Sequence, residues 1–100
     1  MNNLTSVVVP EPAQFYCEAD ERNFFTWLSG IDGISKYVGT QSGLNLTIPT
    51  PMDRGSFYDL VGLLSRYSLD LKCLRPLTIN HPDQWFTDKK NYWYEKVFSS

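Results

Sequence analysis

The C-terminal segment concentrates the aromatic side chains of this 100-residue chain, and it restricts the possible folds more than any other feature. Six of the fifteen aromatic residues fall within positions 85–100. So much apolar ring surface at one end must be buried, either on the chain's own core or on a partner. The six residues are Trp85, Phe86, Tyr92, Trp93, Tyr94 and Phe98.

Length and composition predict one globular domain. A chain of 100 residues suits a single modest core, and 42% hydrophobic with 20% charged residues is ordinary for folded proteins. The net charge of −2 argues against a general nucleic-acid binder, because such proteins need a basic surface. Glu18, Asp20 and Glu21 form the one concentrated charge cluster, which is typical of a helix N-terminus.

The chain carries two cysteines, Cys17 and Cys73, which form neither a disulfide framework nor a C-x-x-C pair. Its beginning lacks the basic stretch and the apolar core of a signal peptide. No apolar run approaches the ~20 residues that span a bilayer. We therefore expect a cytoplasmic protein that does not contact membranes and whose thiols are free and buried.

Residues 1–12 are expected to form a flexible tail, because the first residues are polar and two prolines interrupt regular structure. An edge strand at 7–9 is the alternative. The single folded domain is then expected over 13–100. A short β-prone run at 14–17 opens it.

Two stretches have the apolar spacing of amphipathic helices. The first is expected at 20–30 with Asp20 as N-cap, and the second follows a cap at Asp53 or Ser56. The apolar stripe of the first helix is Phe24, Trp27, Leu28 and Ile31. The stripe of the second is Phe57, Leu60, Val61 and Leu64.

Between these helices the sequence predicts a β-hairpin with strands at 34–39 and 44–48. The second strand alternates apolar and polar residues, which indicates one buried face, and the turn at 40–43 ends in a glycine that can take positive φ. Residues 69–79 are ambiguous. Alternating apolar residues favour a further strand, whereas Asp70 could cap a short helix.

A helical turn at 84–86 and a final helix capped by Asp88 complete the prediction. The expected order is β-α-β-β-α-(β)-α. This order corresponds to an α+β fold, in which a small antiparallel sheet of three or four strands has about three helices packed on it.

Few residues in the sequence are candidates for catalysis or metal binding. His81 is the single histidine and lies in an expected turn, whereas a metal site needs several ligands. A nucleophilic pair of His81 with Cys17 or Cys73 is an alternative, but both thiols fall in apolar alternation that predicts burial. The glycine-rich phosphate-binding motifs are absent. We therefore expect no enzymatic activity, no cofactor and no metal.

The C-terminal third of the chain has a leucine-rich helix that ends in Arg-Tyr, then a Leu-Asp pair, then a closing aromatic segment. This order of motifs resembles that of small bacterial immunity proteins that are encoded beside polymorphic or contact-dependent growth-inhibition toxins. The resemblance extends over residues 20–98. Its segments are 24–28, 63–71, Leu74, 85–88 and 92–98.

The resemblance implies a cytosolic protein that binds one cognate toxin and blocks it stoichiometrically, without chemistry. Toxins with nuclease activity are commonly basic, so an acidic patch would steer and specify such a partner. The candidates for that patch are Glu18, Asp20, Glu21 and Asp32. Tyrosine and tryptophan are frequent hot spots at interfaces, although core packing also explains aromatic residues. The aromatic candidates are Tyr37, Tyr58, Tyr67, Trp85 and Tyr94.

The alternative function is a self-associating structural or adaptor module. In that case the C-terminal aromatic residues or an edge of the hairpin would pair between two copies and give a homodimer.

Overall fold

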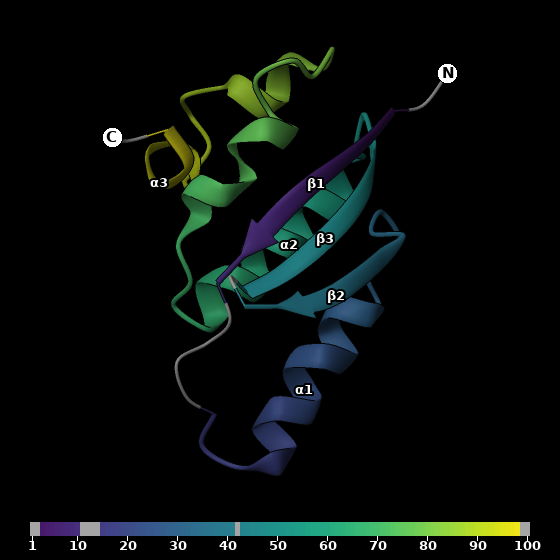
Figure 1. Ribbon diagram of the computed structural model, residues 1–100. Coiled ribbons are helices and arrows are strands. Elements are labelled where there is room, and N and C mark those ends of the chain that lie inside the picture. Colours follow the sequence, from purple (N-terminus) through teal and green to yellow (C-terminus); the bar gives the residue numbers. More distant parts are fainter. Residues whose placement is uncertain (1–2, 11–14, 42, 99–100) are drawn as a thin grey trace.

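The structure is a computed structural model that describes residues 3–10, 15–41 and 43–98 (Figure 1). Its strands form one antiparallel sheet in the order β1-β3-β2, and helix α2 lies behind this sheet in the view of Figure 1. The elements are β1 (Asn3–Val9), α1 (Glu18–Ser29), β2 (Lys36–Thr40), β3 (Gly43–Thr50), α2 (Arg54–Arg66), the 3-10 helices η1 (Leu71–Leu77) and η2 (Gln84–Thr87), and α3 (Tyr94–Phe98). This is the small α+β fold that the sequence predicts.

Strand β1 replaces most of the expected tail. It pairs along its whole length with β3, from Asn3 opposite Thr50 to Val9 opposite Leu44. Val7 and Val9 are buried because alternate residues of a strand face the core. The prediction of a flexible tail was therefore wrong for 3–9, since Pro10 follows the strand and does not prevent it, and the alternative of an edge strand at 7–9 is confirmed. Residues 1–2 and 11–12 lie outside the described part of the chain.

The expected β-prone run at 14–17 is not a strand where it is described. Residues 15–17 lead directly into α1, and Gln14 lies outside the described residues. Helix α1 begins at Glu18, two residues before the expected start. Asp20 is consequently inside the first turn, where its carboxylate accepts a hydrogen bond from the backbone N–H of Tyr16 at 3.1 Å.

The hairpin prediction is confirmed by β2 and β3. Gly43 has a φ of 132°, and a Cβ there would collide with the carbonyl oxygen of Val9. Glycine is therefore required where the central strand β3 begins beside β1. Ser42, within the turn, lies outside the described residues.

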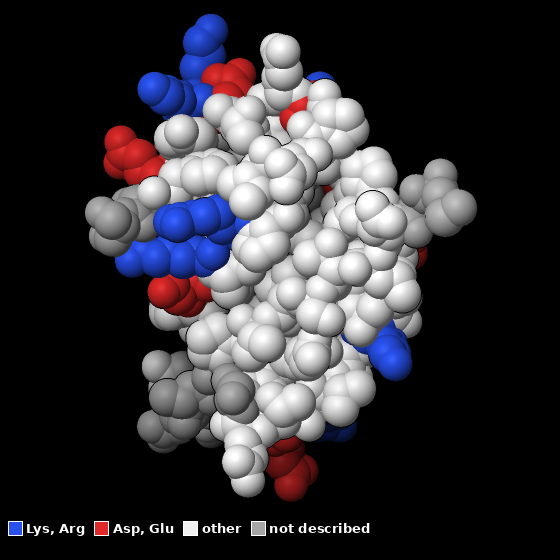
Figure 2. Space-filling view, turned by 45° about the horizontal axis from the view of Figure 1, so that its top comes forward, with Lys and Arg blue, Asp and Glu red and all other residues white. Residues whose placement is uncertain are grey.

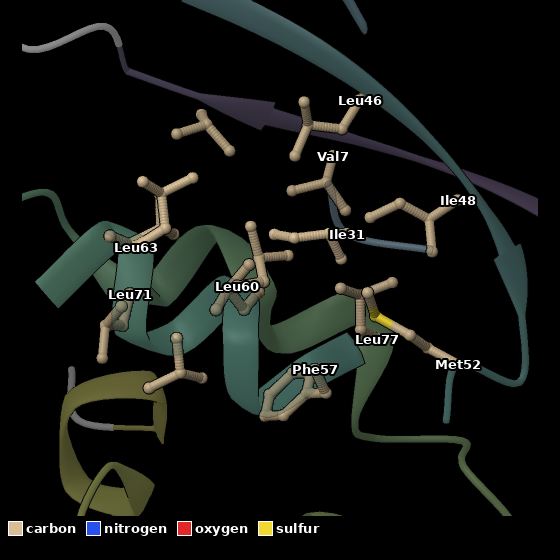
Figure 3. Close-up of a cluster of buried hydrophobic side chains, with 14 of the residues drawn as sticks. Val7, Ile31, Leu46, Ile48, Met52, Phe57, Leu60, Leu63, Leu71 and Leu77 are labelled. Atoms are coloured by element: carbon tan, nitrogen blue, oxygen red, sulfur yellow. The ribbon is translucent and has the colours of Figure 1, made fainter. Parts of the chain in front are cut away.

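Helix α2 begins as predicted at Asp53, whose carboxylate accepts a hydrogen bond from the backbone N–H of Ser56 at 2.9 Å. Its entire predicted apolar stripe is buried. Figure 3 shows Val7, Leu46 and Ile48 of the sheet pointing toward this helix. The core therefore lies between the sheet and α2.

Residues 71–77 form the 3-10 helix η1, so the preference for a strand at 69–79 was wrong. Leu71, Leu74 and Leu77 are all buried, and their spacing of three matches the 3.0 residues per turn of a 3-10 helix. Asp70 caps η1 by accepting from the backbone N–H of Lys72 at 2.9 Å, as the helical alternative requires.

The C-terminal aromatic residues are buried mainly in the chain's own core. Phe86 and Trp93 are fully buried, and the centroid of each ring lies 5.0 Å from that of Phe57 in α2. The final helix starts at Tyr94 and not near Asp88, whose carboxylate instead accepts from the backbone N–H of Lys90 in a turn. None of the helices in the described part of the chain is long and apolar enough to cross a bilayer.

Candidate binding surfaces

Three of the four candidate acids lie together in the first turn of α1. Glu18 and Glu21 are exposed, and Asp20 is half-buried. We call these three residues the acidic turn. Asp32 lies beyond the other end of this 12-residue helix, about 18 Å away along its axis, and does not belong to the cluster. Tyr16, which was not predicted, is 94% exposed beside the acidic turn.

Tyr37 and Tyr67 are half-buried in an aromatic cluster at α1. The ring of Tyr37 stacks on Phe25 with centroids 5.8 Å apart. The hydroxyl of Tyr67 donates to the backbone carbonyl of Asp20 at 3.2 Å, and burial raises the pKa of that hydroxyl. Both side chains therefore hold α1 against the rest of the fold and offer little free surface.

Trp85 and Tyr94 are also half-buried. The ring of Trp85 lies under the guanidinium of Arg54, whose carbon is 5.4 Å from the ring centroid. Arg54 makes two hydrogen bonds to the carboxylate of Asp83, at 2.6 and 2.9 Å, and these bonds lower the pKa of Asp83 to about 2. Tyr94 packs on Phe98 with centroids 4.6 Å apart.

Tyr58 is the one aromatic candidate that is largely free. Its side chain is 51% exposed on α2 and meets Tyr92, which is 59% exposed, with ring centroids 6.1 Å apart. Desolvation, together with the contact to Tyr58, raises the pKa of Tyr92. Trp27 of α1 is 39% exposed and reaches Gly62, one turn after Tyr58 on α2. We call Trp27, Tyr58 and Tyr92 the aromatic ridge.

Sequence reasoning missed two residues of this ridge. Trp27 has the spacing of the apolar stripe of α1, so the pattern assigns it to the core. Tyr92 belongs to the C-terminal aromatic group, which the pattern treats as one packing unit. Glycine at position 62 is the signal that could have found Trp27, because it leaves room for a large ring above α2.

The acidic turn and the aromatic ridge occupy the same pair of helices. Three contacts show that α1 and α2 are antiparallel, namely Tyr67 with Asp20, Gly62 with Trp27, and Ser56 with Gly33. Asp20 and Trp27 are seven residues apart, or about 10 Å along the helix. One protein partner can therefore contact both features.

The imidazole of His81 is fully engaged within the fold. Its Nδ1 accepts from the backbone N–H of Asp83 at 3.0 Å, which leaves the proton on Nε2 to be donated to the Met52 carbonyl at 2.6 Å. The ring also stacks on Phe86 with centroids 3.6 Å apart. A hollow of about 280 Å³ beside His81 is lined otherwise by amides, hydroxyls, prolines and a leucine.

The two thiols differ from each other. Cys73 is half-buried, and desolvation raises its pKa to about 11, which makes it a poor nucleophile. Cys17 is exposed, so the expectation that both thiols are buried was wrong for this residue. Cys17 follows residues 15–16, which do not form a strand, and it is the N-cap of α1.

Within the described ranges, no group of three or more His, Cys, Asp or Glu side chains could hold a metal ion. Comparison of the chain with protein-family models, curated proteins and solved structures gives no match.

Proposed function

We propose that this protein is a cytoplasmic immunity protein that binds a cognate toxin domain and blocks it stoichiometrically. The observation that carries the proposal is the aromatic ridge. Trp27, Tyr58 and Tyr92 are 39–59% exposed, and two of them stand on helices that are fixed to the core. Tryptophan and tyrosine supply most of the binding energy at many protein interfaces. A preformed ridge also limits the entropy that is lost on binding.

The charges near the ridge indicate the chemistry of the toxin. The acidic turn places two exposed carboxylates, those of Glu18 and Glu21, at the far end of α1 from Trp27. Such a surface attracts a basic partner and accelerates its association. A toxin that binds nucleic acid through lysine and arginine, such as a nuclease domain, has a basic surface that complements these carboxylates.

The environments of His81 and Cys73 support a role in binding without catalysis. Both imidazole nitrogens of His81 form hydrogen bonds to backbone groups, and the Cys73 thiol donates to the carbonyl of Asp70 at 3.2 Å. A general base needs a free nitrogen, and a reactive cysteine needs an accessible thiolate. These residues therefore serve the fold in our proposal, and no cofactor or nucleic acid is involved.

The test is protection of cells from the toxin encoded beside this chain. Wild-type protein is expected to restore growth when the two are co-expressed. The double variant Tyr58→Ala/Tyr92→Ala should bind at least ~30-fold more weakly, since losing hot-spot residues costs about 2 kcal/mol or more. Protection should therefore fall although the protein remains folded by circular dichroism.

Ile79→Ala is the matched control, because Ile79 is an exposed apolar residue (55%) outside the ridge. This variant should protect as well as the wild type. The proposal is wrong if the wild type gives no protection, or if the double variant protects as well as Ile79→Ala does.

A further inference from the structure

The N-terminal end of α2 borders a groove to which the proposed function assigns no role. The groove has a volume of about 1110 Å³ and lies between the start of α2 and the segment 82–90. Three basic side chains line it, those of Arg54, Lys89 and Lys90, together with the ring of Trp85. We call these four residues the basic groove.

Arg54 is held in a fixed position at the groove. Its Nε and Nη2 atoms donate to the carboxylate of Asp83 at 2.6 and 2.9 Å, and its guanidinium carbon lies 5.4 Å from the centroid of the Trp85 ring. The side chain of Arg54 is nevertheless 59% exposed, so the N–H groups that Asp83 does not use are accessible to a ligand. Guanidinium groups bind carboxylates well because their planar donors match the two carboxylate oxygens.

The basic groove has an excess of positive charge. Its three cations accompany two carboxylates, Asp83 and Asp88, and both carboxylates already accept hydrogen bonds. Asp83 accepts from Arg54, and Asp88 accepts from the backbone N–H of Lys90 at 2.9 Å. Lys89 and Lys90 are exposed, and within the described ranges neither forms an ion pair. An anion that enters the groove therefore meets two ammonium groups that are not neutralised by a nearby carboxylate.

The basic groove continues the aromatic ridge at the end opposite to the acidic turn. Arg54 and Tyr58 are four residues apart on α2, so they lie on the same face of the helix. Tyr92, which meets Tyr58, follows Lys90 by two residues. The acidic turn lies at the other end of α2, roughly 20 Å from Arg54 along the helix axis. A single partner that covers the ridge therefore reaches both charged ends.

The surroundings of Trp85 indicate that the anion belongs to a protein. Single-stranded nucleic acids bind by stacking their bases on free aromatic faces, whereas Arg54 lies over the half-buried ring of Trp85. The same ring also contacts the rings of Phe57, Phe86 and Trp93. A carboxylate needs no aromatic face, and the net charge of −2 opposes a polyanion such as nucleic acid.

The sheet side of the molecule has no comparable group of cations among the described strand residues. Lys36 is the one charged residue of the three strands. Figure 2 includes this side and shows a broad area that is free of acidic and basic side chains. An acidic segment is therefore attracted to the basic groove and not to the sheet.

We propose that the basic groove binds an acidic segment of the same toxin domain that contacts the aromatic ridge. This inference rests on the proposed function and adds that the toxin surface is bipolar. Its basic part faces the acidic turn, and its carboxylates face Arg54, Lys89 and Lys90. The two charged ends fix the direction in which the toxin lies across α1 and α2, because the reversed direction would bring like charges together.

Titration calorimetry with the purified, inactivated product of the neighbouring toxin gene tests the inference through the sign of a charge effect. Lys89→Glu/Lys90→Glu should raise the dissociation constant about tenfold or more, because it places carboxylates against carboxylates. Both lysines are exposed, so the melting temperature of this variant should match that of the wild type.

Lys36→Glu/Lys72→Glu is the matched control. It changes the net charge by the same amount, at two exposed lysines outside the basic groove. The control should bind the toxin at least as tightly as the wild type does, because added negative charge attracts the basic part of the toxin from a distance. The two double variants are therefore expected to change the affinity differently although their net charges are equal.

Three outcomes would contradict the inference. If the wild type binds the toxin and Lys89→Glu/Lys90→Glu binds it equally well or more tightly, the inference is wrong and the proposed function stands. A wild type that does not bind the toxin would overturn both. Binding of a single-stranded oligothymidylate to the wild type, lost in Lys89→Glu/Lys90→Glu, would assign the groove to nucleic acid instead.

Discussion

Gly33 leaves no room for a methyl group beside α2. Its backbone N–H donates to the hydroxyl of Ser56 at 3.0 Å, and a Cβ would lie only 2.7 Å from the Ser56 Cβ. Gly33→Ala should therefore push the segment after α1 away from α2. We expect a loss of about 2 kcal/mol in the free energy of unfolding, measured by urea denaturation.

Gly62→Ala is the matched substitution. A Cβ at Gly62 would lie 3.5 Å from Cζ2 of Trp27, which is an ordinary contact, and alanine favours the helix. This variant should gain up to about 1 kcal/mol. Equal effects of the two substitutions would contradict the close approach described for Gly33.

Residue identity alone did not reveal which aromatic side chains are free. Tyr58 and Tyr67 are both tyrosines at or near α2, yet one is exposed and the other packs on α1. The difference arises because α1 packs antiparallel against one side of α2, and no local pattern encodes which side that is. Candidate hot spots could therefore be named from the sequence, but their exposure required the tertiary structure.

Helix α2 ends in a motif that prefers glycine. The backbone N–H of Leu69 donates to the carbonyl of Leu64 at 2.8 Å, and that of Ser68 donates to Ser65 at 3.2 Å. This Schellman arrangement places Ser68 in the left-handed region, with a φ of 59°. Ser68→Gly should therefore stabilise the protein by about 0.5–1 kcal/mol. A lower melting temperature would contradict this interpretation of the helix end.

Asp53 and Asp83, the N-caps of α2 and η2, make the free energy of unfolding depend on pH. Backbone N–H groups that bond to Asp53 lower its pKa below the 3.8 of a free side chain, and Arg54 lowers that of Asp83 to about 2. Because the folded-state pKa values are lowered, the stabilisation is complete above about pH 4 and is lost as the pH falls toward 2.

Thermal unfolding between pH 5 and pH 2 measures this dependence. Asp83→Asn removes one of the two titrating groups, so its melting temperature should fall less steeply with pH than that of the wild type. Identical slopes would show that the pair of Arg54 and Asp83 does not form in solution.

The sequence predicts best those elements whose apolar residues recur with the period of a helix or a strand and are all buried on one face. The stripe of α2 and the alternation of β3 are examples, since each packs one regular face on the core. Strand β1 was expected only as an alternative at 7–9, because three of the four residues at 3–6 are polar. Helix η1 was the less favoured of two alternatives, because Leu69, Leu71 and Cys73 also alternate as in a strand. Only the packing of η1 beside β1 and α3 distinguishes the two.

At the scale of the whole molecule, the two sides of the protein have different chemistry. The helical side carries the aromatic ridge and the acidic turn, whereas the sheet presents a mixture of aliphatic and neutral polar side chains with one lysine. The described part of the chain therefore has two separate surfaces, one on the helices and one on the sheet. In our proposal the helical side receives the toxin.

The most direct test is titration calorimetry of this protein with the purified, inactivated product of the neighbouring toxin gene. We predict saturable binding of one toxin domain per chain, weakened at least ~30-fold by Tyr58→Ala/Tyr92→Ala and unchanged by Ile79→Ala. Absence of binding, or equal affinity of the double variant and the wild type, would contradict a function based on the aromatic ridge.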